Sequence, residues 1–440
     1  MMIGYYFGLG IRHLRRNPIL TALMILTLAC GIAASMSTLT VLRAMSADPM
    51  PQKSDRLITP LLDVRPNDGR DSEPEPPHQL SYRDAIALHA ANKGVRQSLL
   101  YQVRPVIEST RPNVAPVSTQ ALAVHTDFFA MIDAPFVRGA PWTARDDGRA
   151  GHVVVLRQGI ADKMFGATDP IGKTVRLENQ DFVVVGVITD DWEPLPHFYR
   201  LVGGTGSFSD SMDLLVPFGT AIALEWPQQA SVNCFEPDPN ANSFEGLKQS
   251  SCVWVGLWVE LAAASEIAAY KDFLVAYQAE QRKLGRFPRP DNHRVYDVNG
   301  WLAARKVVAQ DARTQTYLAF GFLLVCLVNV IGLLLAKFTA RAGEIGVRRA
   351  LGARRTSVFQ QYLTEAAVIG FVGGLVGLAL TFGLLWLLGR QSEPLARLAH
   401  MDWVMFATTL ALAVIASLLA GLLPTWRAMQ IQPALQLKSQ

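Results

Sequence analysis

Residues 166–174, GATDPIGKT, contain the residue types of a phosphate-binding loop. Such a loop has four residues between its glycines, so that backbone amides cradle the phosphates and the lysine reaches them. Here five residues separate Gly166 from Gly172, and Asp169 and Pro170 are unsuited to an amide cradle. We therefore interpret this segment as a turn between a helix and a strand, and predict no nucleotide site in it.

No other residues have the spacing of a catalytic or metal site. The eight histidines are scattered, without a pair at metal-ligand spacing, and the sequence has no nucleophile elbow. His152 and His197 flank strand candidates and are interpreted as surface or hydrogen-bonded core residues. The acidic pairs at 146–147 and 190–191 are typical of turns. We predict no catalytic residue, no metal ligand and no cofactor in this chain.

The four cysteines fall into two classes. Cys30 and Cys326 lie in apolar stretches and are expected to be inert packing residues. Cys234 and Cys252 lie in a polar region. If that region is outside the cytoplasm, they either form a disulfide, which would contribute roughly 3 kcal/mol, or remain two buried free thiols.

Half of the 440 residues are hydrophobic, and they gather in four stretches at residues 19–42, 317–336, 366–388 and 403–423. Each stretch is long enough to cross a membrane as a helix and contains no Asp, Glu, Lys or Arg. A cleaved signal peptide is the alternative for the first, but its apolar run exceeds the roughly 7–15 residues of a signal core.

Basic residues predict the orientation of these spans, because they are enriched on the cytoplasmic side. They precede the first span and gather between the second and third, at Arg12, Arg15, Arg16, Lys337, Arg341, Arg348, Arg349, Arg354 and Arg355. Both chain ends are therefore predicted to be cytoplasmic, and the region between the first two spans extracytoplasmic. The net charge of only +4 gives no sign of nucleic-acid binding.

The segments around the spans have distinct patterns. Residues 1–17 have helical apolar spacing and predict an interfacial amphipathic helix. Residues 301–341 lack proline and predict one helix of roughly 60 Å that extends from the second span as a stalk. In the third span, small residues at GxxxG spacing predict close packing, either between two copies or against the fourth span. These residues are Gly370, Gly373, Gly374 and Gly377.

The external region combines strand and helix patterns, which predicts an α+β domain. Strands are expected at residues 153–156, 182–188, 212–217 and 253–261, and helices at 81–93 and 263–286. Residues 202–251 are rich in Gly, Ser, Asn and Pro, so the domain is expected to have one body or two lobes.

The segment between the second and third spans reads EIGVRRALGARR from Glu344 to Arg355. It resembles the signature of the MacB/FtsX family of ABC-transporter permeases, and the LRRNP run that ends at Pro18 and the GLLPTWRA run that starts at Gly421 are similar to the family's two ends. The external run from Phe128 to Val187 is similar to its periplasmic core domain.

The resemblance implies that this segment docks on an ATPase subunit. The residues it assigns to ATPase coupling are Glu344, Ile345, Gly346, Val347, Arg348, Arg349, Leu351, Gly352, Arg354 and Arg355. The arginines are expected to pair with acidic groups, Ile345, Val347 and Leu351 to fill an apolar groove, and Gly352 to end a short helix or permit close contact. A basic loop that contacts lipid headgroups alone is the alternative from composition.

The fold class that follows is a four-helix membrane protein with a large α+β periplasmic domain between helices 1 and 2. The expected parts are an amphipathic helix (1–17), span 1 (18–42), a MacB-like domain (43–300), stalk and span 2 (301–340), a coupling segment (341–362), span 3 (363–389), a periplasmic loop (390–402), span 4 (403–424) and a cytoplasmic tail (425–440).

The family also implies a function and partners. The chain is expected to be an inner-membrane permease that extrudes a peptide, antibiotic or lipid-linked substrate, with ATP and Mg²⁺ bound by a separate ATPase in two copies. A second permease, identical or homologous, and a periplasmic adaptor are further expected partners. The alternatives are a regulator of an external enzyme, such as a cell-wall hydrolase, and a lipoprotein-extracting subunit.

Overall fold

The computed structural model describes residues 17–430 except 69–72, 110, 112–113, 204–205, 237–238, 290–291, 309, 392 and 399–400. The chain divides into two compact units, one of which is Ala47–Val307 and the other the segments on either side of it. Most of the predicted amphipathic helix, residues 1–16, and the tail beyond residue 430 lie outside the described residues.

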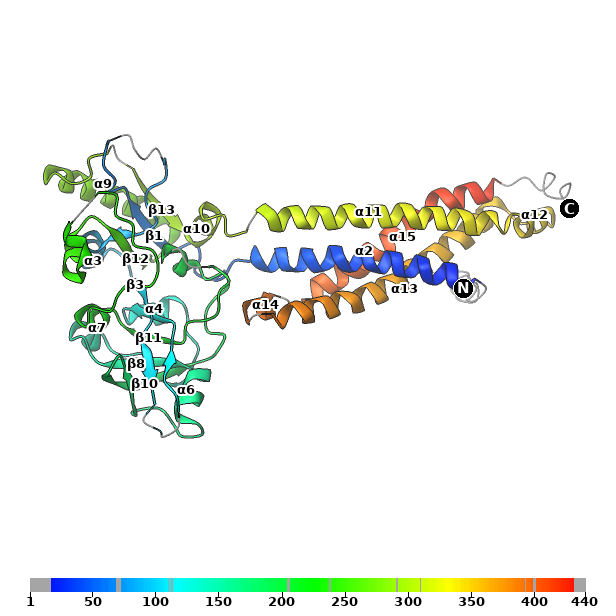
Figure 1. Cartoon of the computed structure of the whole chain (residues 1–440). Helices are drawn as coiled ribbons and strands as arrows, with labels where there is room; N and C mark the ends of the chain where they lie inside the picture. Colours follow the sequence, from blue (N-terminus) through cyan, green and yellow to red (C-terminus); the bar gives the residue numbers. More distant parts are fainter. Residues whose placement is uncertain are drawn as a thin grey trace. The chain divides into compact units, whose positions relative to one another are not determined.

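Long helices make up the first unit (Figure 1). In the described part of the chain, four have the length and composition to cross a membrane, as predicted: α2 Pro18–Met45, α11 Gln310–Thr339, α13 Arg355–Gly389 and α15 Trp403–Met429. Two shorter helices are α12 Ala342–Ala350 and α14 Glu393–Leu398. Helix α13 packs against both α2 and α15, and α11 packs against α2.

The second unit is built on one mixed sheet, which confirms the α+β prediction. The strand order is β13-β1-β12-β3-β6-β11-β8-β10-β9-β4-β5, with β2 paired to β12 and β7 to β10. The pairs β6–β11 and β8–β10 are parallel, and the remaining pairs are antiparallel. The strands are β1 Leu57–Leu62, β2 Leu80–Ser81, β3 Arg96–Val103, β4 Val106–Glu108, β5 Val117–Ser118, β6 Ala121–Val124, β7 Phe136–Gly139, β8 Val153–Arg157, β9 Thr174–Leu177, β10 Gln180–Ile188, β11 Leu214–Pro217, β12 Val253–Glu260 and β13 His293–Asp297.

Helices cover this sheet. They are α3 Tyr82–Ala90, α4 Asp127–Met131, α5 Ala144–Gly148, α6 Gln158–Phe165, α7 Phe218–Ala223, α8 Phe244–Gln249, α9 Ile267–Lys283 and α10 Val298–Ala304, with 3-10 turns η1 Phe198–Gly203, η2 Pro239–Asn242 and η3 Ala264–Glu266. Every residue of β12 is buried. Its neighbours Leu257 and Trp258 belong to two different core clusters, as the alternation of side chains along a strand requires.

Residues 202–251, which are rich in loop-forming residues, left two arrangements open for this domain, one body or two lobes. Within them, however, β11 pairs with β6 on one side and β8 on the other. The segment therefore belongs to the central sheet, and Ala47–Val307 is one unit.

The predicted continuous helix at residues 301–341 is wrong. Helix α10 ends at Ala304, and α11 begins at Gln310. The stop is a Schellman motif, in which Lys306 has a left-handed φ of 50° and the amides of Lys306 and Val307 donate to the carbonyls of Ala303 and Leu302. Glycine is usual at the Lys306 position, so composition gave no sign of the break. The 30 residues of α11 span about 45 Å.

Candidate functional site

Helix α12 carries the segment singled out for its basic residues. Its end is a second Schellman motif, in which Gly352 has a φ of +97° and the amides of Gly352 and Ala353 donate to the carbonyls of Arg349 and Arg348. A residue with a Cβ would be strained there. Gly352 therefore ends α12, which is one of the two roles predicted for it, and α13 begins at Arg355.

The inner face of α12 packs on its own helix bundle. Ile345 is only 2% exposed and belongs to a core cluster with Phe338, Val358 and Tyr362. The rings of Phe338 and Tyr362 lie 4.5 Å apart between centroids. Ile345 thus shares one buried apolar cluster with residues of α11 and of α13.

The outer surface of α12, defined here as Val347, Leu351, Arg354 and Arg355, faces away from the bundle. Val347 is 50% exposed and Leu351 is 83% exposed. Arg354 and Arg355 are exposed and have no polar partner within the described residues. The expectation that Ile345, Val347 and Leu351 together fill a partner's groove is corrected, since Ile345 is occupied within the bundle.

Other polar side chains of α12 are engaged locally. Arg348 forms an ion pair of 2.7 Å with Glu344 one turn earlier, and its other terminal nitrogen donates to Gln361 on α13 at 3.3 Å. Arg349 donates to the carbonyl of Met429 at the end of α15, at 3.3 Å. These arginines hold α12 against the bundle, so Arg354 and Arg355 are the freer cations.

A depression of about 460 Å³ lies beside the outer surface. Its lining residues are Arg348, Leu351, Gly352, Ala353, Ser357, Val358 and Gln361. Both apolar and cationic groups border it. Such a depression is suited to receive a protruding apolar side chain from a protein whose surrounding surface is acidic.

A buried group of charges lies at the same end of the bundle and was not identified from sequence. Lys337 of α11 lies 2.6 Å from Glu365 of α13, and the two side chains are 0% and 2% exposed. Arg341, just before α12, lies 3.7 Å from the other oxygen of Glu365. We call these three residues the buried ion cluster. They flank the apolar stretches, so only the tertiary packing shows that they meet.

The small residues of α13 face two different helices of the same chain. A Cβ at Gly374 would lie 2.6 Å from that of Ala413 on α15, and one at Gly370 would lie 3.0 Å from the Ala413 carbonyl. Gly373 and Gly377 instead face α2. Close packing of α13 against α15 and α2 of the same chain therefore accounts for the small residues at all four positions.

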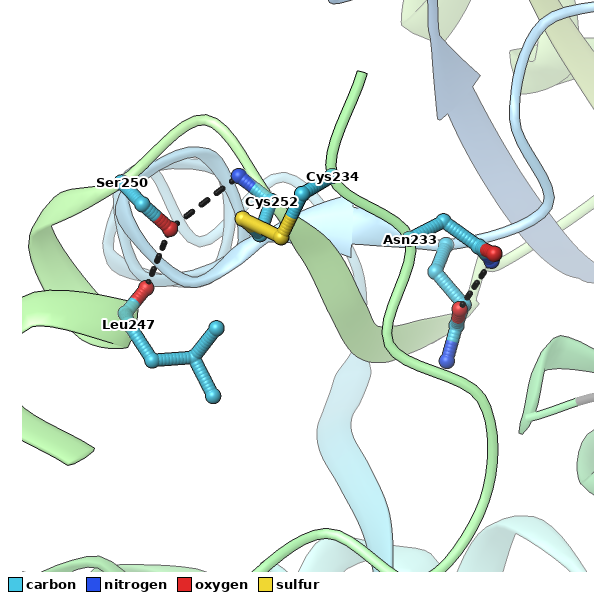
Figure 2. Close-up of a disulfide and its surroundings, with 6 residues drawn as sticks. Asn233, Cys234, Leu247, Ser250 and Cys252 are labelled. Atoms are coloured by element: carbon cyan, nitrogen blue, oxygen red, sulfur yellow. Dashed lines mark hydrogen bonds between the residues drawn. A yellow bond between two sulfur atoms is a disulfide. The ribbon is translucent and has the colours of Figure 1, made fainter. Parts of the chain in front are cut away.

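In the second unit, Ala47–Val307, which we call the external unit, Cys234 and Cys252 form a disulfide (Figure 2). The hydroxyl of Ser250 accepts from the Cys252 amide at 3.1 Å and donates to the carbonyl of Leu247 at 2.8 Å. The disulfide thus joins the loop that carries Cys234 to the start of β12. The two remaining cysteines lie in α2 and α11, where Cys30 is exposed and Cys326 is buried.

Burial shifts the pKa of several acids and bases of the external unit. Burial is the main cause that raises the pKa of Asp147 to about 6, against hydrogen bonds from the Thr126 amide and the Trp142 indole. Burial also lowers the pKa of His125 to about 3 and of His78 to about 4. Across the described residues, no group of three or more His, Cys, Asp or Glu has a metal-binding arrangement.

The motif that resembled a phosphate loop is a turn. Gly166, at a φ of +62°, ends α6, and Gly172, at +76°, precedes β9. His197 lies with its ring nitrogens 3.0 Å from the carbonyls of Pro194 and Ser209, as predicted for a hydrogen-bonded core residue.

Two family models match the chain. The MacB-like periplasmic core domain matches residues 21–275, and the FtsX-like permease C-terminal model matches residues 317–433. Together they include most of the external unit, most of α2 and α11, and all of α12, α13 and α15.

Curated relatives show the same likeness. The pyoverdine export ATP-binding/permease protein PvdT of Pseudomonas aeruginosa is 28% identical over 325 residues, which are 72% of this chain and 42% of that protein. The macrolide export ATP-binding/permease protein MacB of Azoarcus sp. is 26% identical over 438 residues, 98% of this chain and 59% of that protein. The chain spans about half the length of the curated relatives it matches.

Among solved structures, the periplasmic region of MacB from Actinobacillus actinomycetemcomitans is similar, with 12% identity and a TM-score of 0.37 over 60% of this chain and 98% of that one. The extracellular domain of the ABC-type transporter YknZ from Gram-positive bacteria has 14% identity and a TM-score of 0.31, over 48% of this chain and 87% of that one.

Proposed function

This chain belongs to the family of permeases with a MacB-like periplasmic core domain and an FtsX-like C-terminal region, and we propose that it is the membrane subunit of an ATP-driven exporter. Its substrate class would be a peptide, an antibiotic or a lipid-linked molecule on the outer side of a bacterial inner membrane. The two relatives named above are exporters of pyoverdine and of macrolides, which supports extrusion as the direction of transport.

The observation that carries this proposal is the two-sided character of α12. Its inner face is fixed to α11 and α13 through Ile345, while its outer surface presents Leu351 and two cations to solvent. An exposed leucine beside free arginines is suited to a partner with an apolar pocket rimmed by acidic groups. In the proposed complex that partner is an ATPase subunit, present in two copies, which binds ATP and Mg²⁺.

Movement of the ATPases would reach the membrane helices through the inner face of α12. Arg341 and Lys337 connect the α11–α12 junction to Glu365 of α13, so these elements would move together. At the other boundary, Asn299 of α10 donates to Asp48, shortly after α2, at 2.8 Å. The external unit thereby holds its two chain connections together, and we propose that motion of α2 and α11 enters it there.

The proposed orientation places α12 and both chain ends in the cytoplasm. The complex would contain two permeases, identical or homologous, and an external adaptor is a further proposed partner. The ATP-binding part of the complex is proposed to be an ABC ATPase, since residues 1–440 contain no glycine-rich loop with phosphate-binding spacing and the two relatives are named as ATP-binding/permease proteins.

Co-purification of the intact chain in mild detergent tests this function. Wild type is expected to retain an ABC ATPase, and a variant with Leu351→Asp and Arg354→Glu is expected to lose it, because the change removes an apolar contact and reverses a charge. Arg427→Glu is the matched control, since Arg427 is an exposed cation in the last turn of α15. An ATPase that is absent from the wild-type eluate, or retained equally by all three proteins, would contradict the proposed docking.

A further inference from the structure

A pocket of the external unit lies where three of its connections meet. These are the link between β3 and β4, the hairpin between β9 and β10, and the segment that follows α7. The cavity has a volume of about 390 Å³, which is within the range of pockets for small organic ligands. We call it the Trp226 pocket and define it by six of its lining residues, Arg104, Glu178, Leu224, Glu225, Trp226 and Pro227.

Backbone hydrogen bonds hold the walls of this pocket to the sheet. The amide of Gln229, in the segment after α7, donates to the carbonyl of Gln102 on β3 at 3.0 Å. The amide of Glu178, in the hairpin, donates to the carbonyl of Val106 on β4 at 3.2 Å. The pocket is therefore formed before any ligand arrives, as most small-molecule sites are.

Trp226 provides an apolar floor. Its side chain is only 6% exposed, and its ring lies 5.7 Å from that of Phe182 between centroids. The hydroxyl of Tyr101 donates to the Trp226 carbonyl at 3.3 Å, which fixes the backbone at this point. Leu224 and Pro227 extend the apolar lining. This part of the pocket is suited to an apolar side chain.

Glu225 places a carboxylate at the pocket at a cost to the backbone. Its φ is 53°, and the amides of Glu225 and Trp226 donate to the carbonyls of Ile222 and Ala221, so α7 ends in a Schellman motif. Glycine is usual at this position because a Cβ makes the left-handed region unfavourable. The Glu225 side chain is exposed and forms no hydrogen bond or ion pair with the described residues. The fold gives no reason for a glutamate here, and unfavourable backbone conformations are typical of ligand sites.

A second carboxylate and one cation line the same pocket. Glu178, with a φ of 46°, is the first residue of the two-residue hairpin turn, where asparagine is usual. One of its oxygens accepts from the Val106 amide at 2.8 Å, which leaves the other available. Arg104 is exposed, and its guanidinium has no hydrogen bond or ion pair in the described part of the chain.

We propose that the Trp226 pocket binds a short peptide whose two ends are free. Its ammonium group would lie against Glu225 and Glu178, its carboxylate against Arg104, and an apolar side chain over Trp226. A guanidinium matches a carboxylate with two parallel hydrogen bonds. A ligand with a charge of one sign would leave either the guanidinium or the two carboxylates unpaired, whereas a zwitterion complements both. The proposed function assigns no ligand to the external unit, and this inference does not rest on docking at α12.

Titration calorimetry of the full chain in mild detergent tests the site, with the dipeptide leucyl-leucine as the probe. Wild type is expected to bind it at one saturable site. Glu225→Gln and Arg104→Gln are each expected to weaken binding about fivefold, the effect of losing one solvent-exposed ion pair. Glu280→Gln is the matched control, because Glu280 is an exposed glutamate of α9 outside the pocket.

Glu225→Gly separates the role of the carboxylate from the fold. Glycine adopts the left-handed φ without strain, so this variant should unfold at a higher denaturant concentration than wild type and yet bind the dipeptide more weakly. A stabilised Glu225→Gly that binds as tightly as wild type would overturn the assignment of Glu225.

Blocked dipeptides identify which end meets which residue. N-acetyl-leucyl-leucine lacks the ammonium group, so its affinity should not change with Glu225→Gln. Leucyl-leucine amide lacks the carboxylate, so its affinity should not change with Arg104→Gln. No binding of leucyl-leucine to wild type at millimolar concentration, or equal affinities for the free and both blocked dipeptides, would refute the proposal. ATPase co-purification reports separately on α12, so either proposal can fail alone.

Discussion

The buried ion cluster makes a sharp prediction about stability. Glu365→Gln would remove the negative charge that faces Lys337 at 2.6 Å and Arg341 at 3.7 Å. Lys337 and Arg341, which are 0% and 8% exposed, would then face a neutral amide in place of the carboxylate. Lys337→Met is milder, because Glu365 keeps Arg341 as its partner and the remaining pair is neutral.

The distances set the size of the effect. At 2.6 Å and an effective dielectric constant of about 20, the attraction between Lys337 and Glu365 is about 6 kcal/mol, part of which offsets the desolvation of both groups. Removal of one partner of a buried pair typically costs about 3–5 kcal/mol, and we expect Glu365→Gln to fall in that range. The double variant Lys337→Met with Glu365→Leu removes the two most deeply buried charges together, so it should lower the free energy of unfolding less than Glu365→Gln.

Equilibrium unfolding of the intact chain in mild detergent measures these differences. Asp402→Asn is the matched control, since Asp402 pairs with Arg43 at 3.3 Å but both side chains are about half exposed, at 53% and 49%. An exposed pair contributes about 0–1 kcal/mol, and Asn can still cap α15. If Glu365→Gln lowers the free energy of unfolding no more than Asp402→Asn does, the three charges of the buried ion cluster are not buried as described. In that case they do not couple α12 to α13.

Three further predictions concern packing, covalent linkage and pH. Gly374→Leu should cost about 1–3 kcal/mol in the same unfolding assay, because its Cβ would lie 2.6 Å from that of Ala413. Replacement of Cys234 and Cys252 by serine should lower the free energy of unfolding of the external unit by about 3 kcal/mol, measured by denaturant titration. The pKa of Asp147 is raised to about 6 in the folded chain, so the folded state binds a proton more tightly than the unfolded state. The contribution of Asp147 to the free energy of unfolding should therefore decline as pH rises from 4 to 6. The difference in free energy of unfolding between wild type and Asp147→Asn should change over that pH window and stay constant above it.

The spans and the main secondary structure could be predicted from the sequence because their signals are local. Twenty-residue apolar runs define the long helices, and β-branched runs at residues 153–156 and 182–188 became β8 and β10. Gly352 marked the end of α12 because a left-handed residue there favours glycine. At Lys306 the same motif uses a residue that carries no such signal, so the break before α11 was missed.

The candidate site was predicted less completely, and for geometric reasons. Ile345 and Val347 are two residues apart, so they lie about 200° apart around a helix and cannot both enter one groove. That periodicity was available in the sequence and separates the inner face of α12 from its outer surface. The buried ion cluster was not accessible in this way, because Lys337 and Glu365 come together only through the packing of α11 on α13.

In the proposed function, α12 transmits force between an ATPase and the membrane helices. Its most direct test is ATP hydrolysis by the reconstituted complex, measured with wild type, with Ile345→Ala and with Arg427→Glu. Ile345 contacts the bundle and not the outer surface, so Ile345→Ala should keep the ATPase bound but uncouple hydrolysis from movement of α11, detected by a spectroscopic probe on that helix. If Ile345→Ala leaves that movement unchanged, or if α11 does not move with nucleotide in wild type, α12 does not transmit force in the proposed way.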